Sequence, residues 1–110
     1  DIEPSFITNK IISANIFIFS KKMLFNKEIL KGKIIAIVNA DPGFDFLFAV
    51  GISGLITAYG GPNSHMAIRA SEFSVPAVIG IGNDKFESLV NNVLTTIDGQ
   101  TRRWFQEAYR

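Results

Sequence analysis

The segment GGPNSHMAIRA, residues 60–70, contains the only histidine of the 110-residue chain. This histidine, His65, follows two glycines and a serine, and the sequence places it at the first turn of a predicted helix. A helix N-terminus carries free N–H groups and a partial positive charge, so anions are stabilised there. A neutral imidazole at that position could attack phosphorus, and the phosphohistidine produced would be an anion in a place that favours anions.

The same sequence gives less support to His65 as a metal ligand or as a general base. As a metal ligand it has no second histidine and no cysteine to join it, so we expect no metal site. As a general base it would need a nucleophile, and Ser64 is adjacent in sequence, which rarely gives a productive geometry. A lone histidine near a helix start is most often a surface or capping residue. The residues alone therefore permit phosphoryl chemistry without selecting it.

The residues around His65 are compatible with a bound phosphate. Gly60 and Gly61 allow unusual backbone angles and a close approach by a phosphate or a partner surface. Ser64 is a good N-cap residue, and a simple capping role is the more common one for serine at this position. Arg69 lies four positions after His65, on the same helical face, and is a candidate phosphate contact, although an exposed arginine on a helix is usually only solvated.

Strands and helices alternate along the predicted chain, which indicates an α/β fold. Apolar runs predict strands at residues 15–19, 33–40, 54–59, 75–82 and 93–98. Helices are predicted at residues 42–50, with Asp41 as cap, and at 65–73, with a helical turn within 83–92. Residues 1–13 cannot be assigned, and the final segment 101–109 suits either a strand or a helix. The irregular stretch 21–32 offers apolar residues that could pack: Met23, Leu24, Ile29 and Leu30.

Length, charge and composition restrict the classes of protein. A chain of 110 residues with 47% hydrophobic residues suits one domain with a real core. A net charge of +1, from 11 basic and 10 acidic residues, argues against a nucleic-acid partner, and the bases Arg102, Arg103 and Arg110 are too few to change that. The absence of cysteine fits a reducing, cytoplasmic compartment. No apolar run is long enough for a membrane span, so we expect no membrane partner.

The stretch GGPNSHMAIRASEFSVPAVIGIG resembles the signature of the phosphohistidine, or mobile, domain of phosphoenolpyruvate-utilising enzymes. The family pattern has Gly-Gly, two residues, Ser-His, spaced alanines and then a Pro-Ala-Val-containing strand. It is matched here by Gly60, Gly61, Ser64, His65, Ala67, Ala70, Pro76, Ala77, Val78 and Gly80. Upstream, KGKIIAIVNADPGF resembles the family's strand followed by Asp-Pro-Gly and an aromatic residue, and downstream TTIDGQTRRW resembles its closing strand and turn. The resemblance covers residues 31–104.

The resemblance implies a single compact, three-layer β/β/α swivelling domain, here residues 1–110 of a larger multidomain enzyme. His65 would be the phosphoryl acceptor, and Gly60, Gly61, Asn63 and Ser64 would shape its loop and stabilise the phosphate. The domain would accept the group at one active site and deliver it at a second, as in a phosphotransferase similar to phosphoenolpyruvate synthase or pyruvate phosphate dikinase.

The resemblance also implies where the cofactors belong. This domain would bind none itself; Mg²⁺ and ATP or phosphoenolpyruvate would be bound by partner domains of the same enzyme, one for nucleotide and one for phosphoenolpyruvate or pyruvate. The domain alone should therefore have no turnover. Asn63 stands where the family commonly has threonine. A second interpretation is a non-catalytic interaction or regulatory module that keeps the fold, and a third is a plain structural α/β domain.

Overall fold

The computed structural model describes residues 3–19 and 26–107. Its strands are β1 (Ser5–Ile7), β2 (Ile11–Ile18), β3 (Ile34–Ile37), β4 (Gly54–Thr57), β5 (Ala77–Ile79), β6 (Leu94–Asp98) and β7 (Arg103–Gln106). Its helices are α1 (Phe46–Val50), α2 (His65–Glu72) and α3 (Asn83–Glu87), with the 3₁₀ turns η1 (Lys27–Leu30) and η2 (Pro42–Phe44). In this part of the chain, no helix is both long and apolar enough to cross a membrane.

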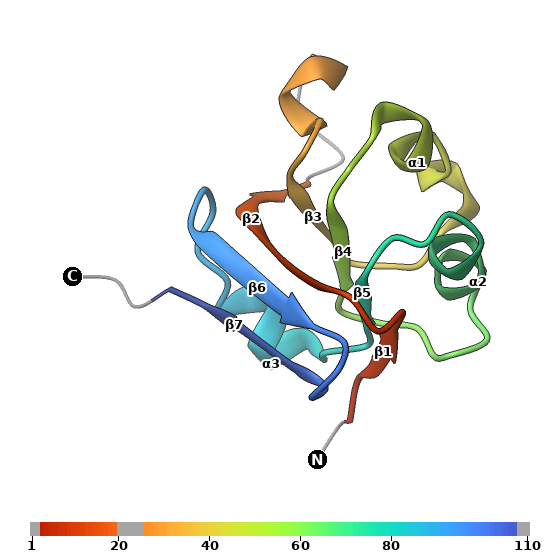
Figure 1. Cartoon of the computed structure of the whole chain (residues 1–110), viewed down its shortest axis with the longest axis vertical. Helices are drawn as coiled ribbons and strands as arrows, with labels where there is room; N and C mark the ends of the chain where they lie inside the picture. The colour runs from red at the N-terminus through yellow and green to blue at the C-terminus, as the bar shows by residue number, and fades with distance from the viewer. Residues whose placement is uncertain (1–2, 20–25, 108–110) are drawn as a thin grey trace.

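The strands form one curled sheet in the order β1-β5-β4-β3-β2-β6-β7. The long strand β2 joins its two parts, because Ile11–Asn15 pair antiparallel with β6 while Ile16–Ile18 pair parallel with β3. Figure 1 shows α1 and α2 on one side of the central strands, and β6, β7 and α3 on the other. The fold is α/β, as the alternation of strands and helices predicts, and it has the compact β/β/α arrangement that the resemblance implies.

The central strand β3 explains why its sequence is a nearly continuous apolar run. Side chains alternate between the two faces of a strand. Ile35 and Ile37 pack into the core beneath α1 and α2, whereas Ile34 and Ala36 pack into the core beneath β6 and β7. All four side chains are fully buried, because both faces of the sheet are covered at this point.

The predicted strands lie in the right places, but their bounds differ. The predicted strand 33–40 ends at Ile37, and the predicted strand 75–82 is reduced to Ala77–Ile79. The predicted strand 15–19 is wrong at its start, since β2 begins at Ile11. The first half of β2 alternates between exposed and half-buried residues, because that part of the sheet has one solvent-facing side. The unassigned N-terminal segment holds β1, a three-residue strand paired antiparallel with β5.

The predicted helix over residues 42–50 is interrupted. Asp41 caps the turn as expected, with its Oδ1 accepting a hydrogen bond of 2.8 Å from the Gly43 N–H, but the turn is 3₁₀ and ends at Phe44 before α1 begins. The final segment is a strand, β7, rather than a helix. Leu30 is fully buried, whereas Ile29 is 44% exposed. Met23, Leu24 and Arg110 lie outside the described residues.

Candidate functional site

Two loops at the same edge of the sheet build the site. Strands β3 and β4 are parallel neighbours, with Ile37 opposite Thr57 at their ends. The chain leaves β3 into η2 and α1, and it leaves β4 through Gly60 and Gly61 into α2. Because the carboxyl ends of parallel strands meet at one edge, residues that follow the two strands are brought together there. In Figure 1, α1 and α2 lie side by side on the same face of the sheet.

The glycine exit from β4 requires glycine at one position and not at the other. Gly60 has a φ of +121°, and a Cβ there would lie 3.1 Å from Ile79 Cγ2 and 3.2 Å from Ala40 Cβ. A Cβ at Gly61 would meet nothing within 4 Å. Gly60 therefore gives the loop its shape, while Gly61 leaves open space beside the start of α2.

The end of the neighbouring strand β5 supports this loop from behind. Gly80 has a φ of +86°, and its N–H donates to the carbonyl oxygen and to Oγ1 of buried Thr57, both at 3.0 Å. The Thr57 hydroxyl in turn donates to the Tyr59 carbonyl oxygen at 2.8 Å. A Cβ at Gly80 would lie 2.5 Å from the carbonyl oxygen of Gly60. The backbone of Gly80, directly after β5, thus fixes the start of the loop that leads from β4 to His65.

We expect Gly80→Ala to destabilise the fold by about 2 kcal/mol or more, because alanine would combine an unfavourable positive φ with a backbone clash. Gly61→Ala is the matched control; with open space at its Cβ it should change the free energy of unfolding by less than about 1 kcal/mol. Urea unfolding of both variants measures the difference. Equal stability of the two would show that Gly80 does not support the loop.

Ser64 occupies the N-cap position of α2, but its side chain does not cap the helix. Its hydroxyl donates 2.8 Å to the Gly61 carbonyl oxygen, and its N–H donates to the same oxygen at 3.1 Å. The predicted capping hydrogen bond is therefore wrong, although the predicted position is right. The hydroxyl instead stabilises the glycine turn, and the Ser64 side chain leaves the N–H groups of the first turn of α2 uncapped.

His65 is the first residue of α2, as predicted, and its ring is directed to a partner that the sequence did not indicate. Its Nε2 lies 2.7 Å from Oδ1 of Asp45, which sits between η2 and α1. The side chains of His65 and Asp45 are 38% and 40% exposed, so solvent reaches the pair. An ionised carboxylate can only accept hydrogen bonds, and the ring nitrogen therefore donates in this contact.

Arg69 completes the cluster one helical turn after His65. Its Nε lies 3.9 Å from the same Asp45 oxygen, and one of its terminal nitrogens donates 3.0 Å to Glu72 Oε1. The guanidinium also lies 5.0 Å above the ring of Phe73. The prediction that Arg69 shares a face with His65 is confirmed by their common partner. Among the described residues, Arg69 Nε is a buried polar atom without a hydrogen-bond partner.

Asn63 does not join this cluster through any hydrogen bond that the structure describes, and it is exposed in the turn before α2. Asp45 is the residue that sequence reasoning missed. A usable signal was present: Asp45 and His65 follow two consecutive buried strands, and a βαβ arrangement places such residues at one edge. Among the described residues, no group of three or more histidines or carboxylates could hold a metal ion.

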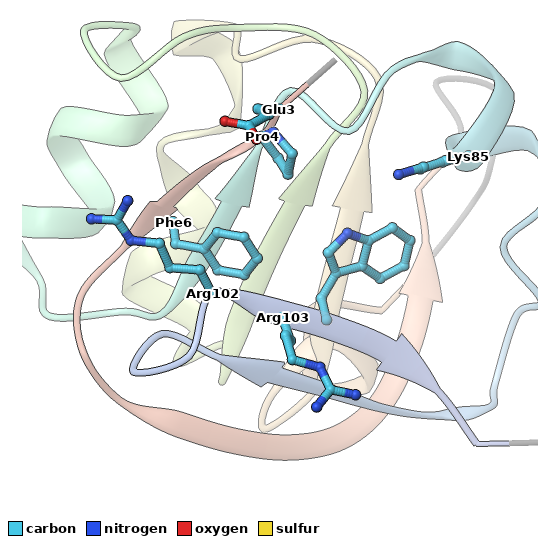
Figure 2. Close-up of a pocket in the computed structure, with 7 residues that line it drawn as sticks. Glu3, Pro4, Phe6, Lys85, Arg102 and Arg103 are labelled. Carbon is cyan, nitrogen blue, oxygen red and sulfur yellow. The ribbon is translucent and has the colours of Figure 1, made fainter. Parts of the chain in front are cut away.

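A separate cavity of about 430 Å³ lies on the other side of the sheet, and its lining includes Phe6, Lys85, Arg102, Arg103 and Trp104. Phe6 and Trp104 pack against the core that faces β6 and β7, not against the core beneath α2. Figure 2 shows the amine of Lys85 directed toward the middle of this pocket, while the Arg103 side chain points away from Phe6. This pocket is therefore distinct from the histidine site.

Two relatives with known names match part of this chain. The chain is 44% identical to rifampicin phosphotransferase of Bacillus cereus over 52 residues, which are 47% of this chain and 6% of that protein. It is 34% identical to phosphoenolpyruvate synthase of Aeropyrum pernix over 73 residues, which are 66% of this chain and 9% of that protein. The chain thus corresponds to less than a tenth of the length of these relatives.

Solved structures give the same fold. A solution structure of a UPF0107 protein superposes with a TM-score of 0.70, covering 97% of this chain and 98% of that one, at 11% identity. A solution structure of Enzyme I superposes with a TM-score of 0.57 at 25% identity, covering 74% of this chain and 34% of that one.

The family model that describes the mobile domain of PEP-utilising enzymes matches residues 29–102, close to the 31–104 expected from the motifs. The matched range includes both loops of the histidine site, from Asp45 to Arg69. The chain belongs to the family of PEP-utilising enzyme mobile domains.

Proposed function

We propose that this domain is a phosphohistidine carrier, which accepts a phosphoryl group on His65 and delivers it to a second active site of the same enzyme. The observation that carries the proposal is the position of the only histidine: it begins α2 within the family match, and its side chain is 38% exposed. An acceptor must be reachable by two different active sites in turn, and a buried ring could not be.

The surroundings of His65 suit the phosphorylated form. The Ser64 side chain does not bond to the first-turn N–H groups of α2, which could therefore donate to an anion at the helix N-terminus. The buried Nε of Arg69 lies on the same side as His65 and could donate to a phosphate oxygen. A Cβ at Gly61 would meet nothing within 4 Å, so this turn could be closely approached, and the exposed Asn63 amide could donate from it.

The donor and acceptor sites belong, in this proposal, to other domains. ATP or phosphoenolpyruvate, with Mg²⁺, would be bound by nucleotide-binding and phosphoenolpyruvate- or pyruvate-binding partners in the cytoplasm. The relatives named phosphoenolpyruvate synthase and rifampicin phosphotransferase are consistent with such phosphotransfer, and we favour chemistry of the synthase or dikinase type. Delivery would require the domain to swivel between the two sites, and this chain alone should show no turnover.

Phosphorylation by the small donor potassium phosphoramidate tests the acceptor directly, without any partner domain. We expect the 110-residue chain to take one phosphoryl group on His65, and the product to be labile in acid and stable in alkali, as a phosphoramidate is. Phosphorus NMR and mass spectrometry of peptides made under alkaline conditions locate the group.

A stable phosphate on Ser64 or a threonine would contradict the proposed acceptor. No phosphorylation at His65 under conditions that modify a free histidine peptide would favour the alternative function, a non-catalytic interaction or regulatory module that retains the fold.

A further inference from the structure

The contact between Asp45 and His65 is unusual for an aspartate at this position in a helix. Asp45 is the N-cap residue of α1, where an aspartate normally accepts a hydrogen bond from its own helix, but its side chain makes no such bond. It reaches across to α2 instead, where Oδ1 lies 2.7 Å from His65 Nε2. Because the carboxylate can only accept, the proton of the neutral ring sits on Nε2 and the lone pair on Nδ1.

This arrangement bears on phosphoryl acceptance, and the inference therefore rests on the proposed function. Nε2 and Arg69 Nε share Asp45 Oδ1 as a neighbour, at 2.7 Å and 3.9 Å, so a phosphate bonded to Nε2 in place of that oxygen would lie near the guanidinium. The Asp45 oxygen now occupies that place: it is in hydrogen-bond contact with Nε2 and 3.9 Å from Arg69 Nε. Arg69 Nε is buried, and at this distance it has no hydrogen-bond partner among the described residues.

We propose that Asp45 is a positioning residue that competes with the phosphoryl group for the space between His65 Nε2 and Arg69. In the unphosphorylated protein it orients the ring and keeps Nε2 protonated. When the phosphoryl group arrives, the carboxylate leaves Nε2, and Arg69 Nε takes a phosphate oxygen as its partner.

Transfer from phosphoramidate begins with a change in the protonation of the ring. Asp45 releases the ring, the proton leaves Nε2 for water, and another proton from water binds Nδ1. The lone pair of Nε2 forms the new N–P bond, and the P–N bond of the donor, whose nitrogen carries three protons, breaks. Neutral ammonia leaves with the electron pair of that bond. While Asp45 holds the proton on Nε2, that nitrogen has no lone pair to donate and the step cannot occur.

Electrostatics adds to this competition. A phosphoryl group on Nε2 and the carboxylate of Asp45 are both negative and would lie within a few ångströms of each other. The His65 and Asp45 side chains are about 40% exposed, so repulsion between unit like charges there lies between its value in water and its value for a half-buried pair. Repulsion of that size corresponds to roughly a tenfold change in the rate of phosphorylation or in the lifetime of the phosphohistidine. Removing the charge of Asp45 should therefore favour the phosphorylated state.

The test compares Asp45→Asn with the wild-type chain in two measurements. With phosphoramidate as donor, we expect the variant to be phosphorylated on Nε2 of His65 about tenfold faster, and its phosphohistidine to hydrolyse more slowly. Nitrogen-15 NMR of the single histidine should show the neutral wild-type ring protonated on Nε2, and the variant shifted toward the Nδ1-protonated form. Asp84→Asn, the same substitution at an exposed residue of α3, is the control and should match the wild type in both measurements.

Each contrary result has a distinct meaning. If the wild type and Asp45→Asn are phosphorylated at His65 at equal rates, or if the variant is slower, the role of Asp45 is overturned while the carrier function stands. A wild-type ring protonated on Nδ1 also overturns it. If neither protein is phosphorylated at His65 at all, the proposed function fails, and the role of Asp45 fails with it.

Discussion

His65→Ala should abolish phosphoryl acceptance while leaving the fold almost intact. The substitution removes the nucleophile, and no second histidine exists to replace it. The ring contributes one hydrogen-bonded contact with Asp45 in a solvent-accessible place, and such exposed pairs are worth about 1 kcal/mol or less. We therefore expect the free energy of unfolding to fall by no more than about 1 kcal/mol, with phosphorylation reduced to the background of the reagent.

The measurement pairs phosphorus NMR after treatment with phosphoramidate with urea unfolding of the same preparation. His65→Gln serves as a second variant, since glutamine keeps a polar side chain of similar reach at the start of α2 but has no nucleophilic nitrogen. Both variants should lose acceptance and keep their unfolding midpoints. If either unfolds several kcal/mol more easily, His65 is a structural residue and the carrier proposal loses its main support.

The position of His65 could be predicted because the signals that fix it are local. A buried strand, a glycine exit and a short run compatible with a helix follow one another within about 20 residues, and backbone sterics decide where each begins. The same is true of Asp41, whose predicted cap on the next turn is present. These features are determined by residues that are close in sequence, so tertiary packing does not change where they occur.

The partners of the site residues could not be predicted in the same way. Asp45 looked like the interior of a helix over residues 42–50, yet the chain changes there from a 3₁₀ turn to α1, and the side chain is directed across to α2. Ser64 has the residue type of a cap, but its hydroxyl bonds to the Gly61 carbonyl oxygen because the glycine turn brings that acceptor closer. In both cases the competing partner comes from the folded loop geometry, which residue type does not encode.

The edges of the sheet were equally hard to infer. Strand β1 has only three residues, and its pairing with β5 involves partners at least 70 positions away. The start of β2 carries half-buried and exposed residues in alternation, which is a weaker signal than the apolar run of β3. Continuous apolar runs mark the strands that are covered on both faces, and these strands carry the two loops of the histidine site.

Ile35 in β3 contrasts with His65, because its truncation should lower the stability of the fold and leave phosphorylation unchanged. Ile35 is fully buried and belongs to the core beneath α1 and α2, and it lies between Phe17 of β2 and Leu55 of β4 in the sheet register. Truncation to alanine removes three buried carbons and leaves a cavity that two paired strands cannot easily close.

We expect Ile35→Ala to cost about 2–5 kcal/mol, a large fraction of the roughly 5–15 kcal/mol that stabilises a domain of this kind. In thermal unfolding the midpoint should fall by about 10 °C or more. Ile11→Ala is the matched control, because Ile11 is also in a strand but is 52% exposed, and it should cost less than about 1 kcal/mol. Phosphorylation of Ile11→Ala by phosphoramidate should remain at the wild-type level. Phosphorylation of Ile35→Ala should do so at temperatures where the variant is folded, because Ile11 lies in β2 and Ile35 in β3, whereas His65 begins α2. If Ile35→Ala unfolds at the same temperature as Ile11→Ala, burial of Ile35 in the core beneath α1 and α2 does not stabilise the domain as expected.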